Sequence, residues 1–232
     1  MKNFYIFLMA FVCSLYAQEY RVLGIGDSSI QYMFGFTDIV RREIPLQDNT
    51  TGYITAYIKA FPGKTMYGSK KISFSEIIPA DLIDSVEAII FDFGTVDTLF
   101  HIAKQASAQN TSIEQIIENL MPDYFSNILH VKETYPDYQG KIIIMTPIPP
   151  LYNSSCSPEP VETKVKIHKL FNAALEKNAY NHSFLFLNPY ASCTTSEGLL
   201  DDLYDANDGV HMNHAYYYIL VAAAYTLLQQ SI

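Results

Sequence analysis

Three short, uninterrupted apolar runs are the feature that most constrains the fold. They are VEAIIFDFG at 86–94, KIIIMTPI at 141–148 and SFLFLNP at 183–189. These runs are rich in Ile and Phe and lack the polar alternation of a half-exposed strand, which is the pattern of strands buried on both faces. Two more strand candidates precede them, a mostly apolar one at 20–26 and an alternating one at 54–61. We therefore expect a sheet with helices packed on both sides.

Longer stretches with helical spacing of apolar residues separate these runs. They lie at 112–135, 160–179 and 213–230. Strands that alternate with helices predict an α/β protein with a mostly parallel sheet. The sequence shows no internal repeat, linker or low-complexity tract, so one domain is expected. Local signals predict the helix ends and irregularities: Thr111 as a cap, Pro122 as a kink or break, and Pro160 in a first turn.

Residues 1–17 are typical of a secretory signal peptide. Lys2 precedes an apolar run too short to span a bilayer with ease, and polar residues follow it. We predict cleavage after Ala17, which leaves residues 18–232 as a single domain in a secreted or periplasmic protein. An uncleaved N-terminal anchor is the alternative, whereas Cys13 does not stand in a lipoprotein motif.

Composition excludes several classes of partner. The formal net charge is −9, and the only arginines are Arg21, Arg41 and Arg42. Nucleic acids and anionic membranes need a basic surface, so neither is an expected partner. Half of the residues are apolar (49%), which also makes a disordered chain improbable.

Two cysteines follow the leader, Cys156 and Cys193, and both stand in polar loop sequence. An exported chain folds in an oxidising compartment, where a pair of cysteines is more often a disulfide than two thiols. We predict a Cys156–Cys193 disulfide. No cysteine spacing indicates a metal site.

Polar and glycine-rich segments stand where three of the predicted strands end. They are Gly26-Asp27-Ser28-Ser29, the segment Pro62 to Met66, and Gly94-Thr95-Val96-Asp97. A fourth segment, DANDGVHMN at 205–213, precedes the last helix. In parallel α/β sheets, ligands bind at the carboxyl ends of the strands. These segments are therefore the candidates for a functional site.

A serine-based catalytic triad can be drawn from these segments. Ser28, at a strand-to-helix turn, is the candidate nucleophile, and a serine hydroxyl needs a base to take its proton. His211 is the candidate base, and Asp208 is placed to hold the imidazole in the correct tautomer. The backbone N–H of Gly63 is a candidate oxyanion donor, because glycine has no side chain in the way. Each segment alone is also ordinary turn or cap sequence, and the hypothesis depends on their combination.

Other interpretations fit less well. Gly24-x-Gly26-x-x-Ser29 follows a strand, but it lacks the third glycine of a dinucleotide fingerprint. His211 and His214, with Asp205 and Asp208 nearby, have the spacing of metal ligands on one helical face but no clear further ligand. The G-x-S-x-G elbow of α/β-hydrolases is absent. We therefore expect neither a metal nor a cofactor.

The order of the four segments resembles the SGNH/GDSL hydrolase superfamily over nearly the whole mature chain. That resemblance implies a flavodoxin-like, three-layer α/β/α sandwich, and an esterase, lipase or carbohydrate deacetylase that needs no cofactor. It assigns Ser28 as nucleophile and Asp208 and His211 as the rest of the triad. It also assigns the N–H groups of Ser28 and Gly63 as oxyanion donors.

The third segment departs from the usual pattern of this superfamily, Gly-x-Asn-Asp, because Val96 stands in place of the asparagine that supplies a third oxyanion donor. The chain resembles a branch that reads Phe-Gly-Glu-Ile-Asp, with a histidine four residues after the aspartate and a Gly-Lys-Thr-Met segment. Asp97, His101 and the segment beginning at Gly63 match that branch, whereas Thr95 does not. Valine has no polar atom, so one donor is missing, and Lys64 and His101 are candidates to replace it.

The sequence thus predicts an exported serine esterase that removes acetyl or other short acyl groups from a small-molecule or glycan ester. Two alternatives remain. Val96 favours a catalytically weakened SGNH scaffold that binds glycan or protein. The same serine chemistry could also transfer an acyl group to a sugar.

Overall fold

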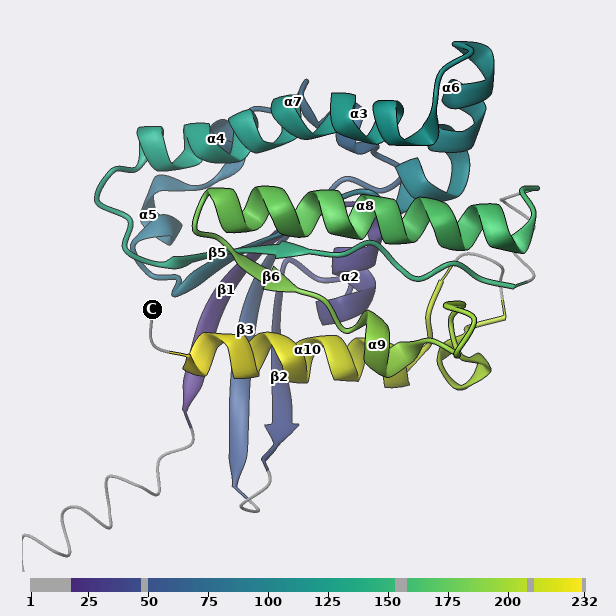
Figure 1. The fold of residues 1–232 in the computed structure, drawn as a ribbon. Helices are drawn as coiled ribbons and strands as arrows, with labels where there is room; N and C mark the ends of the chain where they lie inside the picture. Colours follow the sequence, from purple (N-terminus) through teal and green to yellow (C-terminus); the bar gives the residue numbers. More distant parts are fainter. Residues whose placement is uncertain (1–17, 47–49, 153–157, 208–210, 231–232) are drawn as a thin grey trace, which may run out of the picture.

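A six-stranded, mostly parallel sheet forms the centre of the protein (Figure 1). The computed structural model describes residues 18–46, 50–152, 158–207 and 211–230. The strands follow one another across the sheet in the order β2-β3-β1-β4-β5-β6, and only β2 runs antiparallel to its neighbour. Their bounds are β1 Glu19–Gly26, β2 Ile39–Pro45, β3 Thr51–Ala60, β4 Ala88–Asp92, β5 Lys141–Met145 and β6 Leu185–Leu187.

The five parallel strands alone have the flavodoxin-like order, in which the second strand lies beside the first and the remaining three extend from the other side. All five were expected from the sequence. The antiparallel edge strand β2 was not, because most of its side chains are exposed and leave little apolar signal. In this topology the chain order reverses between β1 and β4, and that point is where ligands bind in open α/β sheets.

Helices cover both faces of the sheet, which confirms the expected three-layer sandwich (Figure 1). One layer contains α7 and α8, and the opposite layer contains α2 and α10. The helices are α2 Ser28–Phe34, α3 Met66–Ser69, α4 Phe74–Ile77, α5 Ala80–Ile83, α6 Ile102–Ala108, α7 Ile113–Thr134, α8 Val161–Asn181, α9 Tyr190–Cys193 and α10 His214–Gln229, with a π-helical turn η1 at Asp97–His101 and a 3₁₀ turn η2 at Asp202–Tyr204.

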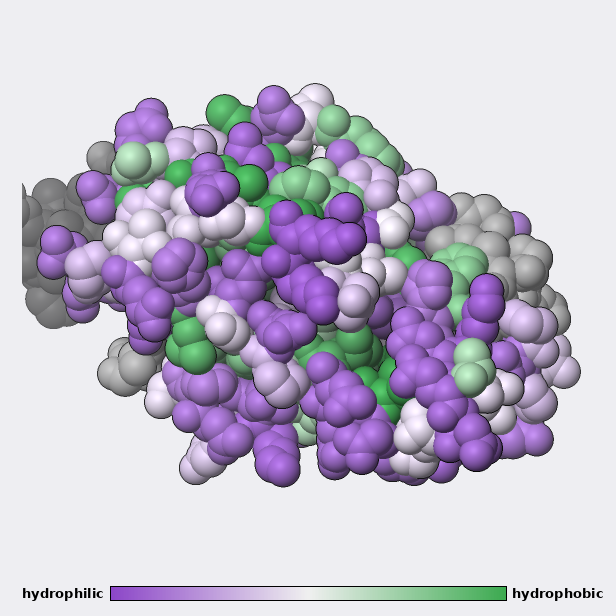
Figure 2. Space-filling model, turned by 90° about the horizontal axis from the view of Figure 1, so that it is seen from above, coloured by the Kyte–Doolittle hydropathy of each residue, from purple (hydrophilic) through white to green (hydrophobic). Residues whose placement is uncertain are grey.

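The alternation of side chains along each strand explains the uninterrupted apolar runs. In β4, Ile89 and Phe91 pack in the core beneath α7 and α8, whereas Ala88 and Ile90 pack in the core beneath α2 and α10. Successive side chains of a strand point to opposite faces, so a strand covered on both sides has apolar residues at successive positions and not at every second one. The outer surface on the α7 side is mostly hydrophilic, with hydrophobic atoms in patches between the polar ones (Figure 2).

A kink at Pro122 stays a prediction, whereas two other sequence expectations about α7, Thr111 as its cap and a break at Pro122, were wrong. Its N-cap is Ser112, whose hydroxyl accepts the N–H of Gln115 at 3.1 Å, and not Thr111. Pro122 lies inside the helix, which continues from Ile113 to Thr134. Proline removes the hydrogen bond to the carbonyl four residues earlier, that of Glu118. Both residues are on the exposed side of α7, where water can hydrogen-bond that carbonyl, so the helix is not ended.

The last helix packs in the core as expected, with Tyr216, Leu220 and Ala224 buried. No helix in the described part of the chain combines the length and the apolar character that a membrane span requires.

Candidate active site

Ser28 is the first residue of α2 and directly follows the turn at the end of β1. The turn is held by Asp27, whose side chain accepts the backbone N–H of Ser29 at 2.8 Å and the Ser29 hydroxyl at 2.7 Å. Asp27 is fully buried, whereas Ser28 is only half-buried. The first N–H groups of a helix have no partner within it. Ser28 therefore presents a hydroxyl and an N–H at a helix N-terminus, next to the carboxyl edge of the sheet.

The approach of β1 to β4 fixes the position of this turn. Gly26 pairs with Asp92 across the two strands, and the N–H of Asp27 donates to the Asp92 carbonyl at 2.9 Å. A Cβ added to Gly26 would lie 2.5 Å from that carbonyl oxygen. Glycine is therefore the residue that allows the strand end, and Ser28 two residues later, to lie this close to β4.

Asp27 and Asp92 form a buried pair of carboxyl groups beneath Ser28. Burial raises the pKa of Asp27 to about 6, although hydrogen bonds from Ser29 and Thr95 and the nearby His211 favour the charged form. Burial, reinforced by the charge of Asp27, raises the pKa of Asp92 well above its usual value. Two neighbouring buried carboxylates repel one another, so ionisation of Asp27 favours a protonated Asp92.

His211 lies against α2, the helix that begins at Ser28. Its ring stacks on Tyr32, with centroids 4.2 Å apart and planes at 23°. Tyr32 is four residues after Ser28, and residues four apart on a helix lie on one face. Tyr32 in turn stacks on Tyr217 of α10, at 5.6 Å. This column of three rings positions the imidazole against α2, and the effect of His211 on the pKa of Asp27 places it near the same turn.

The loop that carries His211 is held at both ends. Asp205 and Met212 form an antiparallel bridge, and the N–H of Ala206 donates to the His211 carbonyl at 3.1 Å. Asn213 then caps α10 by accepting the N–H of Ala215 at 2.9 Å. Asp208, the predicted third member of the triad, lies outside the described residues, so its role stays a prediction.

Gly63 lies in the turn that follows β3. This turn begins beside the segment that carries Ser28, because the N–H of Phe61 donates to the carbonyl of Gly26 at 2.8 Å. Gly63 has a φ of +70°, and a Cβ added to it would meet no atom within 4 Å. Its backbone conformation is therefore a reason for glycine here, in addition to the access to its N–H that we predicted.

Asp97 connects the third segment to the turn of Gly63. Its buried carboxylate accepts the N–H of Met66 at 2.5 Å, at the start of α3. Burial raises the pKa of Asp97 to about 6, partly offset by backbone hydrogen bonds from Met66 and Tyr67. The carboxyl group thus anchors the segment that follows Gly63, and Asp97 is a positioning residue.

The candidates for the missing oxyanion donor lie around the same turns. Val96 is half-buried at the start of η1, and His101 is half-buried at its end. The Lys64 side chain lies over Gly68 of α3. Among the described residues, neither the Lys64 ammonium nor the His101 imidazole has a side-chain hydrogen bond that would fix its direction, so replacement of the donor by either one stays a prediction.

Thr95 is a site residue that the sequence did not reveal. Its hydroxyl lies 3.2 Å from the Ser29 hydroxyl and accepts the N–H of Ile148 at 3.4 Å, while its backbone hydrogen-bonds Asp27. Thr95 therefore joins the carboxyl ends of β1, β4 and β5. Its position in the Gly-x-x-Asp segment was the only signal.

Two other predictions concern metal binding and the disulfide. The parts of the chain that the structure describes contain no group of three or more His, Cys, Asp or Glu side chains placed to hold a metal ion. Cys193 is buried and has no disulfide partner among the described residues. Cys156 lies outside them, so the disulfide also stays a prediction.

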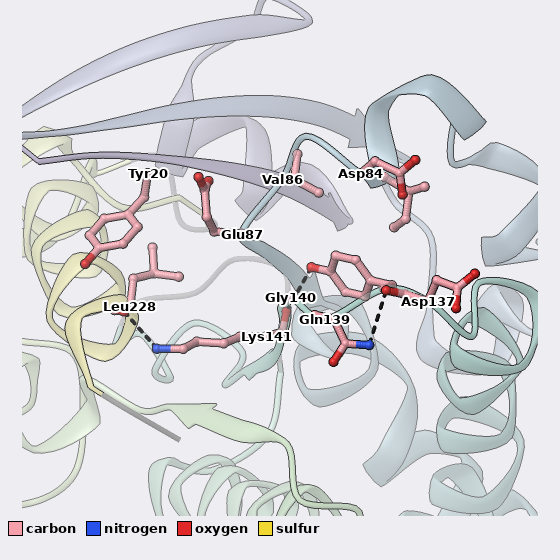
Figure 3. Close-up of a pocket in the computed structure, with 11 residues that line it drawn as sticks. Tyr20, Asp84, Val86, Glu87, Asp137, Gln139, Gly140, Lys141 and Leu228 are labelled. Carbon is pink, nitrogen blue, oxygen red and sulfur yellow. Dashed lines mark hydrogen bonds between the residues drawn. The ribbon is translucent and has the colours of Figure 1, made fainter.

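A pocket of about 510 Å³ lies at the opposite edge of the sheet from Ser28 (Figure 3). Tyr20, Glu87 and Lys141, where β1, β4 and β5 begin, line it together with Leu228 of α10. Lys141 donates to the carbonyls of Leu227 at 3.3 Å and Leu228 at 2.8 Å, and so caps the end of α10. The pocket contains none of the predicted catalytic residues.

Comparison with known proteins identifies the fold. No family model and no curated protein matches the chain. Among solved structures, a GDSL-like lipase from Bacteroides thetaiotaomicron VPI-5482 is 20% identical, with a TM-score of 0.56 over 96% of both chains. An acetylxylan esterase from Geobacillus stearothermophilus, solved as a catalytic mutant, is 14% identical, with a TM-score of 0.55 over 94% of this chain and 97% of that one. A lipase/acylhydrolase from Enterococcus faecalis is also 14% identical, with a TM-score of 0.55 over 90% and 95%.

These likenesses define the class of fold, an α/β/α sandwich shared with known hydrolases. More narrowly, it is the fold of the GDSL-type lipases and acylhydrolases. The resemblance to the SGNH/GDSL superfamily, drawn from the sequence motifs, is confirmed at the level of the fold.

Proposed function

We propose that the protein is an SGNH/GDSL-type ester hydrolase with Ser28 as its nucleophile. The observation that carries the proposal is the placement of Ser28 at the N-terminus of α2, the same helix on which the imidazole of His211 is stacked through Tyr32. The shared fold with a GDSL-like lipase and an acetylxylan esterase supports the same reaction class.

In the proposed reaction, the Ser28 hydroxyl attacks the ester carbonyl while His211 accepts its proton. The oxyanion that forms is bound by the N–H groups of Ser28 and Gly63, which follow the adjacent ends of β1 and β3. His211 then protonates the leaving alcohol, and an acyl group remains on Ser28. Water, deprotonated by His211, releases the acid, with Asp208 as the orienting carboxylate.

We propose a short acyl ester, acetyl in the first instance, on a glycan outside the cytoplasm. The likeness to an acetylxylan esterase and the leader-like residues 1–17 support this assignment. Val96 supports a second candidate function, a binding module on a weakened hydrolase scaffold, because valine cannot donate a hydrogen bond to an oxyanion.

Turnover of p-nitrophenyl acetate and labelling by a fluorophosphonate test this function. We expect Ser28→Ala to abolish both without loss of the folded state, because the side chain is at the surface of the turn. Ser126→Ala, at an exposed position of α7, is the matched control and should leave both unchanged. Labelling at another serine, or normal turnover by Ser28→Ala, would overturn the assignment, and no turnover by the wild type would favour the binding module.

A further inference from the structure

We propose that a second pocket, beside the His211 loop, binds the sugar rings of an uncharged glycan and so forms a subsite for the polymer that carries the ester. We call it the Tyr152 pocket; its walls include Tyr152, Glu197, Asp202, Asp205 and Asn207. The inference deepens the proposed esterase function and rests on it for the choice of substrate.

The pocket is next to the candidate catalytic histidine. Asp205 forms a bridge with Met212, and the N–H of Ala206 donates to the His211 carbonyl at 3.1 Å. The side chain of Asn213 also donates to the Leu203 carbonyl at 2.7 Å. Neighbouring chains in a β-bridge lie about 5 Å apart, so the pocket wall at Asp205 lies next to the segment that carries His211. A glycan bound in the pocket can therefore extend toward Ser28.

The lining suits a sugar better than an acyl chain. The pocket has a volume of about 760 Å³, within the range of small-molecule sites. Its side chains include three carboxylates, an amide and two hydroxyls, which can accept and donate hydrogen bonds to sugar hydroxyls. The Tyr152 ring is 62% exposed and offers a flat apolar surface for the C–H face of a pyranose.

The charge of the lining selects among glycans. Glu197, Asp202 and Asp205 are acidic, and no Lys, Arg or His is among the described residues that line the pocket. A uronic acid, sulfate or phosphate on the glycan would be repelled by these carboxylates, with no cation among the described lining residues to compensate. An uncharged polysaccharide fits these walls.

Hydrogen bonds hold the walls in place. The segment that carries Glu197 is closed by a bridge between Thr194 and Leu200 and by the N–H of Thr195, which donates to Leu199 at 2.8 Å. The N–H of Leu200 donates to Pro150 at 2.9 Å, and this contact joins the segment to the chain that leads to Tyr152. Preformed walls reduce the entropy cost of binding.

The test compares an acetylated oligosaccharide with a small ester. For Tyr152→Ala we expect kcat/KM on acetylated xylotetraose to fall about tenfold, mainly through KM, since one ring contact is lost. Turnover of p-nitrophenyl acetate should stay within about twofold, because that ester is too small to reach the pocket. Tyr180→Ala removes another exposed ring, from the far end of α8, and should change neither rate.

Charge provides a second readout. Wild-type protein should prefer acetylated xylotetraose to an acetylated tetragalacturonate, and the Glu197→Gln/Asp202→Asn double variant should lose most of that preference. Unchanged kinetics on xylotetraose in both Tyr152→Ala and the double variant would overturn the subsite. If the wild type hydrolyses no ester, the esterase proposal fails but the subsite can still be tested. Calorimetric titration with unmodified xylotetraose is then the test of the subsite. If the wild type binds xylotetraose and Tyr152→Ala does not, the subsite is supported. If the wild type does not bind xylotetraose, the subsite is refuted.

Discussion

Gly26→Ala is the substitution with the sharpest structural expectation. The added methyl would lie 2.5 Å from the carbonyl oxygen of Asp92 and 2.9 Å from its Cβ, inside the paired strands β1 and β4. A backbone oxygen cannot move away as a flexible side chain can. Overpacking of a core costs about 1–3 kcal/mol, and loss of the hydrogen bond from Asp27 to Asp92 adds about 1 kcal/mol. The free energy of unfolding should therefore fall by about 2–4 kcal/mol.

Thermal unfolding followed by circular dichroism measures this loss. For a domain of this size, 1 kcal/mol corresponds to about 2–4 °C in Tm, so Tm should fall by about 4–16 °C. Turnover should fall further than the loss of folded protein alone would explain. The reason is that Ser28 moves with the strand end, and a displacement of about 1 Å can lower the rate about 100-fold. Gly24→Ala, in the same strand, is the comparison variant: its methyl would meet the buried side chain of Ile30 and not a backbone oxygen, so activity should be affected less than in Gly26→Ala. A Tm within about 2 °C of wild type and full activity for Gly26→Ala would refute the close-approach argument.

Three further predictions follow from the site. The Asp97 carboxyl has a pKa of about 6 in the folded protein against its usual 3.8, so the stability it contributes is present below about pH 3.8 and is lost as the pH rises through 6. In chemical unfolding, the free energy of unfolding of Asp97→Asn should therefore rise by about 3 kcal/mol relative to that of the wild type between pH 3 and 7. Parallel pH profiles of the two proteins would contradict this. On p-nitrophenyl acetate, Val96→Asn should raise kcat if the third donor position is empty, whereas His101→Ala should lower kcat if the imidazole has taken that role, because one oxyanion donor is worth about 100–1000-fold. Unchanged kcat in both variants would mean that the two N–H groups suffice. Non-reducing peptide mapping of exported protein should find the Cys156–Cys193 disulfide, which would stabilise the fold by about 3–4 kcal/mol, whereas two free thiols would disprove it. Burial raises the pKa of a free Cys193 thiol to about 11, so that thiol would react slowly.

The apolar pattern was sufficient for the layers of the fold. Runs such as 86–94 and 141–148 lack the alternation of apolar and polar residues because both faces of their strands are covered, and this is visible in the sequence alone. The edge strand β2 was not predicted because most of its side chains are exposed, so its sequence has little apolar pattern. The helix break expected at Pro122 was wrong because a helix continues through a proline where the carbonyl that loses its hydrogen bond faces water. Only the packed structure reveals which way that carbonyl faces.

The site was predictable in its residue types but not in its contacts. Ser28, Gly63 and His211 stand at strand or loop ends that a parallel topology brings together. The roles of Thr95 and Asp97 depend on which atoms meet across neighbouring strand ends, such as the Asp97 carboxylate and the N–H of Met66. Nothing in the local sequence around either residue specifies a partner about 30 or more positions away.

Strand register is the physical link between those two levels. Side chains alternate along a strand, so a shift of one residue between β1 and β4 would move each side chain to the opposite face. The observed register sets Gly26 opposite Asp92, and it is possible because position 26 has no Cβ. It also brings the Asp27 turn, Thr95 and the start of α2 to the same edge, at the point where the strand order reverses. The glycine of the Gly-Asp-Ser segment therefore acts on the candidate nucleophile indirectly: it permits the register in which Ser29, the neighbour of Ser28, contacts Thr95 of the third segment.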